Sequence, residues 1–161
     1  MDDQRLKSRA VSLWQEGYQA HMEGDLKRAV ELYTKSIELC PTAEAHTFRG
    51  WAYWHMRRID DAVAECHKAI GVDPDFGNPY NDIGAYLMEK GQLDEAIGWF
   101  EKAKQAPRYE PRHFPFMNLG RLYAAKRMLR KAIEEFEAAL RIEPDELYCR
   151  HALAELQAML N

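Results

Sequence analysis

Histidine and cysteine are the side chains best suited to metal binding and catalysis, and their spacing in this 161-residue chain matches no known site. They lie at His21, His46, His55, His67, His113, His151, Cys40, Cys66 and Cys149. Three cysteines without C-x-x-C spacing predict neither a disulfide framework nor a zinc site. Cys66 and His67 are adjacent, so on a helix their side chains point about 100° apart and do not form a pair.

Sequence motifs for catalysis and phosphate binding are also missing. The chain has no H-E-x-x-H, no G-x-S-x-G and no glycine-rich phosphate loop. We therefore expect no enzyme activity, no metal and no cofactor. Cys66 is expected to fill a helical core rather than to act as a nucleophile.

The composition is typical of an ordinary globular chain, with 47% hydrophobic and 30% charged residues. A formal net charge of −4 gives no electrostatic footprint for nucleic acid, so we expect no such partner. Apolar runs of only a few residues predict no membrane span. The acidic start of the chain, residues 1–5, does not resemble a secretory signal, and a reducing cytoplasm is the expected location.

A repeat of 33 to 36 residues runs along the chain and is marked by small residues. Its columns are a glycine, an alanine twelve residues later, a large residue four further on, and a second small residue after three more. They contain Gly17, Gly50, Gly84, Gly120; Ala29, Ala62, Ala96, Ala132; Tyr33, Cys66, Phe100, Phe136; and Ser36, Ala69, Ala103, Ala139. Pro41, Pro74 and Pro144 close three of the four units.

Each unit contains two segments of helical periodicity joined by a short polar turn. The small residues let two helix backbones approach closely, and the large residue between the alanines fills the space toward the next unit. Gly24 and Gly91 suit the left-handed residue that ends a helix. Proline then stops the second helix, because its ring removes an amide donor. The sequence therefore predicts nine helices and no strands.

These columns resemble the tetratricopeptide repeat family over about residues 10–146. The fourth unit matches the family pattern best, with Phe116, Leu119, Gly120, Tyr123, Ala132, Phe136, Ala139 and Pro144. The first unit departs from it, with Glu16 and Ala20 at the leucine and tyrosine places, and Cys66 replaces phenylalanine in the second. The resemblance implies an all-α fold, a right-handed α-solenoid of antiparallel helix pairs with a concave face.

We expect residues 1–161 to form a single domain of this type, with repeats at about 10–42, 43–76, 77–112 and 113–146. Leucines at helical spacing after Pro144 predict a capping helix over 147–160, which covers the apolar face of the last repeat. Two extra residues and two prolines lengthen the connection over 105–112. This connection is either a neutral insertion or a loop that rims the binding surface.

By family geometry, the first helix of each repeat lines the concave face. In the first two repeats these places hold Val11, Trp14, Gln15, Tyr18, His21, Met22, Glu44, Thr47, Phe48, Trp51, Trp54 and His55. From all four repeats we predict a peptide-binding groove of Trp14, Tyr18, Phe48, Trp51, Trp54, Asn78, Asn81, Asp82, Asn118 and Arg121. Its first half is aromatic, as in many interaction sites, and its second half is polar.

Two readings stay open at several of these places. Some rings could either face the groove or pack between helices, and for Trp54 the two readings are equally consistent with the sequence. Asn78 is equally consistent with a solvated face. A subclass of the family binds the C-terminal carboxylate of chaperones through lysine, asparagine and arginine side chains. The matching places here hold Trp14, Tyr18, Phe48, Asn78 and Asp82, so we expect no such binding.

The leading functional hypothesis is a protein–protein interaction scaffold that takes a peptide or helix of a partner into the aromatic groove. The alternative is a structural protein that self-associates through the same aromatic residues. The chain is expected to be a monomer or a weak homo-oligomer, and the sequence does not identify the partner.

Overall fold

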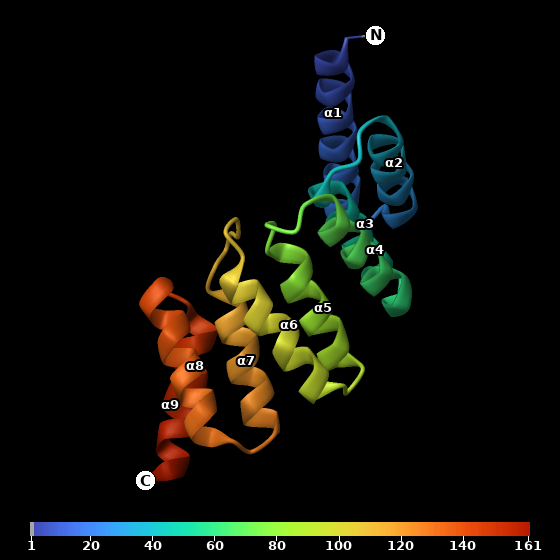
Figure 1. Cartoon of the computed structure of the whole chain (residues 1–161). Coiled ribbons are helices and arrows are strands. Elements are labelled where there is room, and N and C mark those ends of the chain that lie inside the picture. Colours follow the sequence, from blue (N-terminus) through green and yellow to red (C-terminus); the bar gives the residue numbers. More distant parts are fainter. Residues whose placement is uncertain (1) are drawn as a thin grey trace. The chain divides into compact units, whose positions relative to one another are not determined.

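The computed structural model describes residues 2–161, and its regular elements in that range are nine α-helices with no strand, as predicted. They are α1 (Asp3–Met22), α2 (Leu26–Leu39), α3 (Ala43–His55), α4 (Ile59–Val72), α5 (Asn78–Glu89), α6 (Leu93–Gln105), α7 (Phe114–Ala125), α8 (Leu129–Ile142) and α9 (Leu147–Leu160). Successive helices form antiparallel pairs (Figure 1). The all-α class is confirmed.

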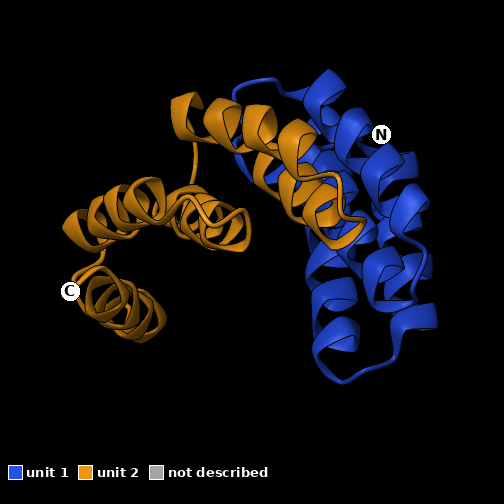
Figure 2. Cartoon of the chain, turned by 90° about the horizontal axis from the view of Figure 1, so that it is seen from below, with its two compact units in different colours: residues 1–79 blue, residues 80–161 orange. Residues whose placement is uncertain are grey.

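The chain divides into two compact units, Met1–Pro79 and Tyr80–Asn161 (Figure 2). In unit 1, α1 packs against α2, α2 against α3, and α3 against α4. In unit 2, α6 packs against α7, α7 against α8, and α8 against α9. The single domain over 1–161 stays a prediction.

The small residues of the repeat lie where two helices touch. A Cβ atom at Gly120 would stand 2.7 Å from the ring of Phe136, closer than side-chain atoms pack. The same relationship joins Gly17 to Tyr33 and Gly84 to Phe100. In the second repeat, Gly50 instead faces the carbonyl oxygen of Ala62, at 3.0 Å. In three of the four repeats, the aromatic ring that fills the core thus requires glycine on the facing helix.

The turns inside the repeats share one left-handed residue. Gly24 has φ 84° and Gly91 has φ 79°, which confirms their predicted role. The equivalent places of the second and fourth repeats hold Arg57 with φ 64° and Arg127 with φ 61°. The sequence analysis did not single out these arginines, although they occupy the same column as the two glycines.

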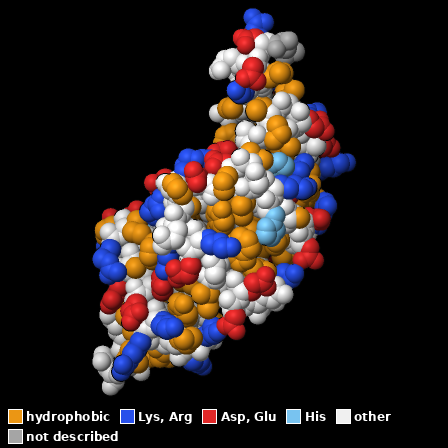
Figure 3. Space-filling view, in the orientation of Figure 1, with side chains coloured by type: hydrophobic (Ala, Val, Ile, Leu, Met, Phe, Trp, Pro, Cys, Tyr) orange, Lys and Arg blue, Asp and Glu red, His pale blue; other side chains and the backbone are white. Residues whose placement is uncertain are grey.

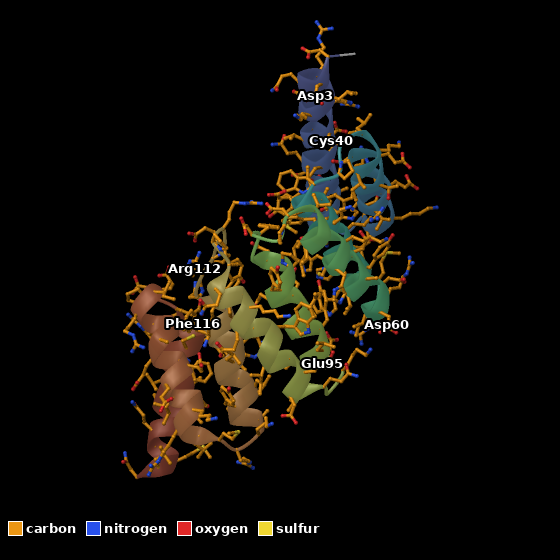
Figure 4. The ribbon with its side chains drawn as sticks, in the orientation of Figure 1. Asp3, Cys40, Asp60, Glu95, Arg112 and Phe116 are labelled. Carbon is orange, nitrogen blue, oxygen red and sulfur yellow. The ribbon has the colours of Figure 1, made fainter. Side chains whose placement is uncertain are left out.

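The long connection between α6 and α7 is closed by Arg112, which is labelled in Figure 4. Its guanidinium donates hydrogen bonds to the carbonyl oxygens of Lys104, Ala106 and Pro107, at 3.3, 3.0 and 3.3 Å. The ring of Tyr109, in the middle of the connection, is buried. The connection is therefore packed onto unit 2 and not a free loop.

The last helix, α9, packs against α8, and its role as a cap stays a prediction. Cys149 and Leu156 on α9 are buried in one cluster with Ala132, Phe136 and Ala139 of α8. Other apolar side chains of α9 contact solvent, among them Leu147 and Met159. In the described part of the chain, no helix has the length and apolarity that crossing a bilayer requires.

Candidate functional site

Helices α1 and α3 of unit 1 bring four aromatic rings together, here called the aromatic row: Trp14, Tyr18, Phe48 and Trp51. The ring of Phe48 lies at its centre, 5.4 Å from Trp14, 5.6 Å from Tyr18 and 6.0 Å from Trp51 between centroids. All three pairs are edge-to-face, the arrangement that aromatic quadrupoles favour. Four of the ten residues predicted for the groove therefore form one contiguous cluster.

Helical spacing explains why these rings meet. Trp14 and Tyr18 are four residues apart on α1, and Phe48 and Trp51 are three apart on α3, so each pair shares one helical face. Trp14 and Phe48 also pack against the buried core of unit 1, while Tyr18 is 41% exposed. The row is thus part core and part surface, and the binding role of its rings stays a prediction.

Two histidines end the row, and the predicted groove residues did not include them. His21 lies against Trp51 with 4.2 Å between ring centroids, and its Nδ1 is 3.3 Å from the buried hydroxyl of Tyr33. Its Nε2 is 3.0 Å from Nδ1 of His55. Burial, and then the neighbouring His55, lower the pKa of His21 to about 4. The buried imidazole of His21 is therefore neutral at neutral pH.

The signal for this pair was present in the sequence. His21 and His55 are 34 residues apart, which is one repeat, and the family register predicts that both places face the groove. Trp54 extends the same cluster, because its ring centroid lies 4.6 Å from that of His55. Trp54 itself is half-buried, and its part in binding stays a prediction.

Two hollows open at the ends of the aromatic row. The first, called the Trp14 hollow, has a volume of ≈ 130 Å³ and is lined by Ala10, Val11, Trp14, Ser36, Thr42 and Glu44. The second, called the Trp51 hollow, has a volume of ≈ 280 Å³ and is lined by His21, Met22, Gly24, Leu26, Trp51 and His55. Both are bordered mainly by α1 and α3, so the row and its hollows form one surface.

The polar half of the predicted groove behaves differently. In unit 2, Asn118 donates a hydrogen bond from Nδ2 to Oδ1 of Asn81, at 3.0 Å, and both side chains are buried. The exposed Arg121 donates to Oδ1 of Asn118, at 3.3 Å. The two amides therefore engage each other and orient Arg121, which is the group of this set that reaches solvent.

The remaining two predicted residues, Asn78 and Asp82, lie on α5 and are partly buried. Burial raises the pKa of Asp82 to about 7, against the opposing effect of a hydrogen bond from Asn81. Asp82 therefore titrates near neutral pH. The binding roles of Asn78, Asn81, Asp82, Asn118 and Arg121 stay predictions.

No group of three or more metal-binding side chains comes together within residues 2–161. Cys66 is fully buried in α4, as expected for a core residue. Figure 3 shows acidic and basic side chains intermixed on the face in view, with hydrophobic patches between them. A mixed surface of this kind creates no extended field of one sign.

Comparison with known proteins places these repeats in a family. Residues 49–111 and 116–146 match models described as tetratricopeptide repeat. Heat shock protein STI1 of Saccharomyces cerevisiae is 31% identical over 91 residues, covering 55% of this chain and 15% of that protein. Small glutamine-rich tetratricopeptide repeat-containing protein 2 of the same yeast is 29% identical over 102 residues, which cover 63% of this chain and 30% of that protein. The chain thus matches less than a third of the length of these relatives.

Solved structures resemble the chain over most of its length. Pseudomonas aeruginosa pilF has a TM-score of 0.89 at 24% identity, covering 96% of this chain and 70% of that one. YrrB, a TPR protein with an unusual peptide-binding site, has a TM-score of 0.70 at 22% identity, and the match covers 90% of this chain and 74% of that one. At such identities the likeness shows the fold. Together with the two family models, which match more than half of the sequence, it shows that this chain belongs to the tetratricopeptide repeat family.

Proposed function

We propose that this chain is a protein-interaction scaffold that binds a peptide or helix of a partner protein along the aromatic row of unit 1. The aromatic row is the observation that carries the proposal. Its rings stay partly exposed on α1 and α3, between Val11, which is 48% exposed, and Met22, which is 50% exposed. Clustered apolar side chains at a surface mark interaction sites, and tryptophan and tyrosine are frequent binding anchors.

The chemistry of the surface favours apolar anchoring over the capture of a terminal carboxylate. Three of the five places where a carboxylate clamp would need basic or amide side chains hold Trp14, Tyr18 and Phe48. YrrB is described as having a peptide-binding site, which is compatible with a similar role here. Three free cysteines fit a reducing cytoplasm, the location that we propose.

The experiment is a pull-down with the intact chain. The recovered partner is then titrated by calorimetry into the wild-type chain and into the Trp51→Ala variant. We expect binding to weaken by about 2 kcal/mol or more, the range of interface hot spots. Phe136→Ala is the matched folding control, because its ring is buried in unit 2 and should cost about 3–5 kcal/mol of stability. The proposal would be contradicted if Trp51→Ala melted at as low a temperature as Phe136→Ala, or if its affinity for the partner equalled that of the wild type.

A second candidate function is self-association, and one observation favours it. On α9, Leu147 is 65% exposed, Met159 57% and Leu160 50%. These side chains offer an apolar contact to a second copy of the chain. Light scattering over a concentration series tests this idea, with Leu147→Glu as the variant. A mass that stays monomeric at every concentration would leave the free aromatic row as the functional surface.

A further inference from the structure

We infer that the guanidinium of Arg121 is a binding site for a carboxylate group of a partner protein, and that the buried amide pair of Asn81 and Asn118 holds it in place. All three residues belong to unit 2, whereas the aromatic row belongs to unit 1. The inference therefore goes beyond the proposed function and does not depend on it.

Arg121 is ordered by two neutral groups on two helices. On its own helix, α7, it donates a hydrogen bond from Nη1 to Oδ1 of Asn118, at 3.3 Å. Its Cζ also lies 5.9 Å from the ring centroid of Tyr148 on α9, a distance at which a cation and an aromatic face attract each other. The ring of Tyr148 packs against the buried ring of Phe136, with 6.1 Å between centroids. An amide and a ring thus hold the guanidinium, while the side chain of Arg121 stays exposed.

The amide pair behind Arg121 is buried, with Asn81 6% and Asn118 7% exposed. Nδ2 of Asn118 donates to Oδ1 of Asn81, at 3.0 Å, so the carbonyl oxygen of Asn118 is left to accept from Arg121. Burying two amides costs desolvation that apolar side chains at these places would avoid. In return, the cation is held ready, and a held side chain loses less entropy on binding than a mobile one.

Arg121 has no acidic partner within residues 2–161. Arg49 in unit 1 is also ordered, but it binds the carboxylate of Glu65, at 2.8 Å. A guanidinium has five N–H donors in a planar fork, and the structure uses one of them at Arg121. The remaining donors match the two oxygens of a carboxylate, which arginine binds in a bidentate manner.

Two acidic side chains contact the groups that support Arg121, and each has another partner. Glu146 accepts a hydrogen bond from the backbone nitrogen of Tyr148, at 3.2 Å. Asp82 accepts one from Asn81, and burial raises the pKa of Asp82 to about 7. At neutral pH, part of the population therefore carries no charge at Asp82. Neither carboxyl group forms an ion pair with Arg121 in the described part of the chain.

The charge at this place selects a ligand with one negative charge. A phosphate group carries about −1.5 to −2 charges at neutral pH and is usually bound by a cluster of basic residues. Lys126, at the end of α7, is already paired with Asp94. One turn beyond Arg121, α7 carries Ala124 and Ala125, whose side chains are too short to cover the guanidinium. A single carboxylate fits the charge and the fork of Arg121.

The carboxylate can come from an aspartate or glutamate side chain or from a chain terminus. The places of the carboxylate clamp lie in the first three repeats, and Arg121 lies in the fourth, so this site is not part of that clamp. The test therefore needs one probe for each source.

The test is an NMR titration of the full chain that follows the Nε–Hε signals of its arginines. The probes are an acetylated and amidated alanine pentapeptide with a central glutamate, the same peptide with glutamine, the glutamine peptide with a free C-terminus, and a phosphoserine peptide. We expect the Arg121 signal to report at least about fivefold tighter binding of one carboxylate peptide than of the capped glutamine peptide. The peptide that binds more tightly identifies the source.

Arg130 is the internal control, because it is exposed on α8 and has no such support in the described residues. Its signal should report binding at least about fivefold weaker than that of Arg121. Arg121→Lys keeps the charge but loses the planar fork, and it should bind more weakly than the wild type. For this variant, the backbone amides of Ala124 and Ala125 report the binding.

The double variant Asn81→Leu with Asn118→Leu tests the amide pair. It replaces both partners by apolar side chains of similar size, a change that can leave stability nearly unchanged. The response of Arg121 should then fall to that of Arg130. A pair with a structural role alone would leave the response of Arg121 as it is in the wild type.

The inference is overturned if Arg121 responds equally to the carboxylate and capped glutamine peptides, or no more strongly than Arg130. It is also overturned if Arg121→Lys binds as tightly as the wild type, or if the phosphoserine peptide binds at least about tenfold more tightly than either carboxylate. Failure of the proposed function gives a different result, because Trp51→Ala should leave the response of Arg121 unchanged. Partner binding that does not depend on Trp51 contradicts the proposed function, and a silent Arg121 contradicts this inference.

Discussion

Nε2 of His21 and Nδ1 of His55 lie 3.0 Å apart, although 34 positions separate the two residues in the chain. The contact joins α1 to α3, the first helices of two successive repeats, beside the ring of Trp51. A buried imidazole in such a place makes the stability of unit 1 depend on pH.

The first prediction concerns that dependence. The pKa of His21 is lowered from 6.5 to about 4, so the unfolded chain binds a proton at a higher pH than the folded chain does. The folded state should keep its full stability above pH 6.5 and lose up to about 3 kcal/mol as the pH falls to 4. Chemical denaturation at several pH values, with wild type and His21→Gln, measures this effect. The variant should show a shallower pH dependence.

The control is His151→Gln, because His151 is exposed on α9 in the other unit. Its pH dependence should match that of the wild type. If His21→Gln and the wild type lose stability in parallel between pH 6.5 and 4, the buried imidazole is not the cause.

The second prediction concerns the carboxylate of Glu65, which is buried in unit 1. Burial would raise its pKa, but hydrogen bonds from His46 and Lys68 and the charge of Arg49 outweigh burial and hold the pKa at about 2. The contribution of this carboxylate to the free energy of unfolding is complete above pH 4.5 and is lost as the pH falls toward 2. Glu65→Gln should cost about 3 kcal/mol at neutral pH, because it leaves Arg49 half-buried without a counter-charge.

Urea denaturation at neutral pH measures this cost. The matched variant is Glu38→Gln at an exposed position of α2, which should change stability by less than about 0.5 kcal/mol. Similar small effects for both variants would show that the network around Glu65 adds little to the fold.

The third prediction concerns the contact between Gly120 and Phe136. Gly120→Ala would place a methyl group 2.7 Å from the ring and should destabilise unit 2 by about 1–3 kcal/mol. Gly98→Ala, on α6, meets no atom within 4 Å and should stabilise by about 0.5–1 kcal/mol. Thermal melting of both variants gives the comparison. Phe136→Leu should cost less in the Gly120→Ala background than alone, and additive effects would argue against the contact.

The fourth prediction concerns the left-handed turn residue of the fourth repeat. Arg127 has φ 61°, a conformation that costs a non-glycine residue about 1 kcal/mol. Arg127→Gly should therefore raise the unfolding free energy by about 0.5–1 kcal/mol, since glycine adopts this conformation without a steric cost. Gly91→Ala, with φ 79°, is the reverse change and should lower it. Denaturant titrations of both variants check the two signs, and the same sign for both would contradict the argument.

Much of the fold follows from residue types at fixed intervals. The columns of Gly120 and Phe136 were visible in the sequence, but the contact between them was not, because the large residue was expected to fill the space toward the next unit. In three repeats the structure instead places the ring against the glycine of its own repeat. Gly24 and Gly91 indicated the helix ends for an equally local reason, their freedom to adopt positive φ. The aromatic row follows from helical spacing together with the family register of the first helices.

Other features were decided by tertiary packing. The bond between Asn118 and Asn81, the closure of the α6–α7 connection by Arg112 and the burial of Tyr109 join residues from different elements of unit 2. Such contacts depend on rotamers and on a few tenths of an ångström between helices, and neither is encoded in a spacing pattern.

The sequence by itself thus determined the helices, the repeat, the left-handed turns at Gly24 and Gly91 and the face on which Trp14, Phe48 and Trp51 would lie, because these depend on short-range periodicity and local backbone freedom. Only the tertiary structure decided that His21 pairs with His55, that a hollow opens at each end of the aromatic row, and that the polar residues near Asn118 bond to one another. These features arise where side chains from separate helices meet, and their geometry exists only once the helices have packed.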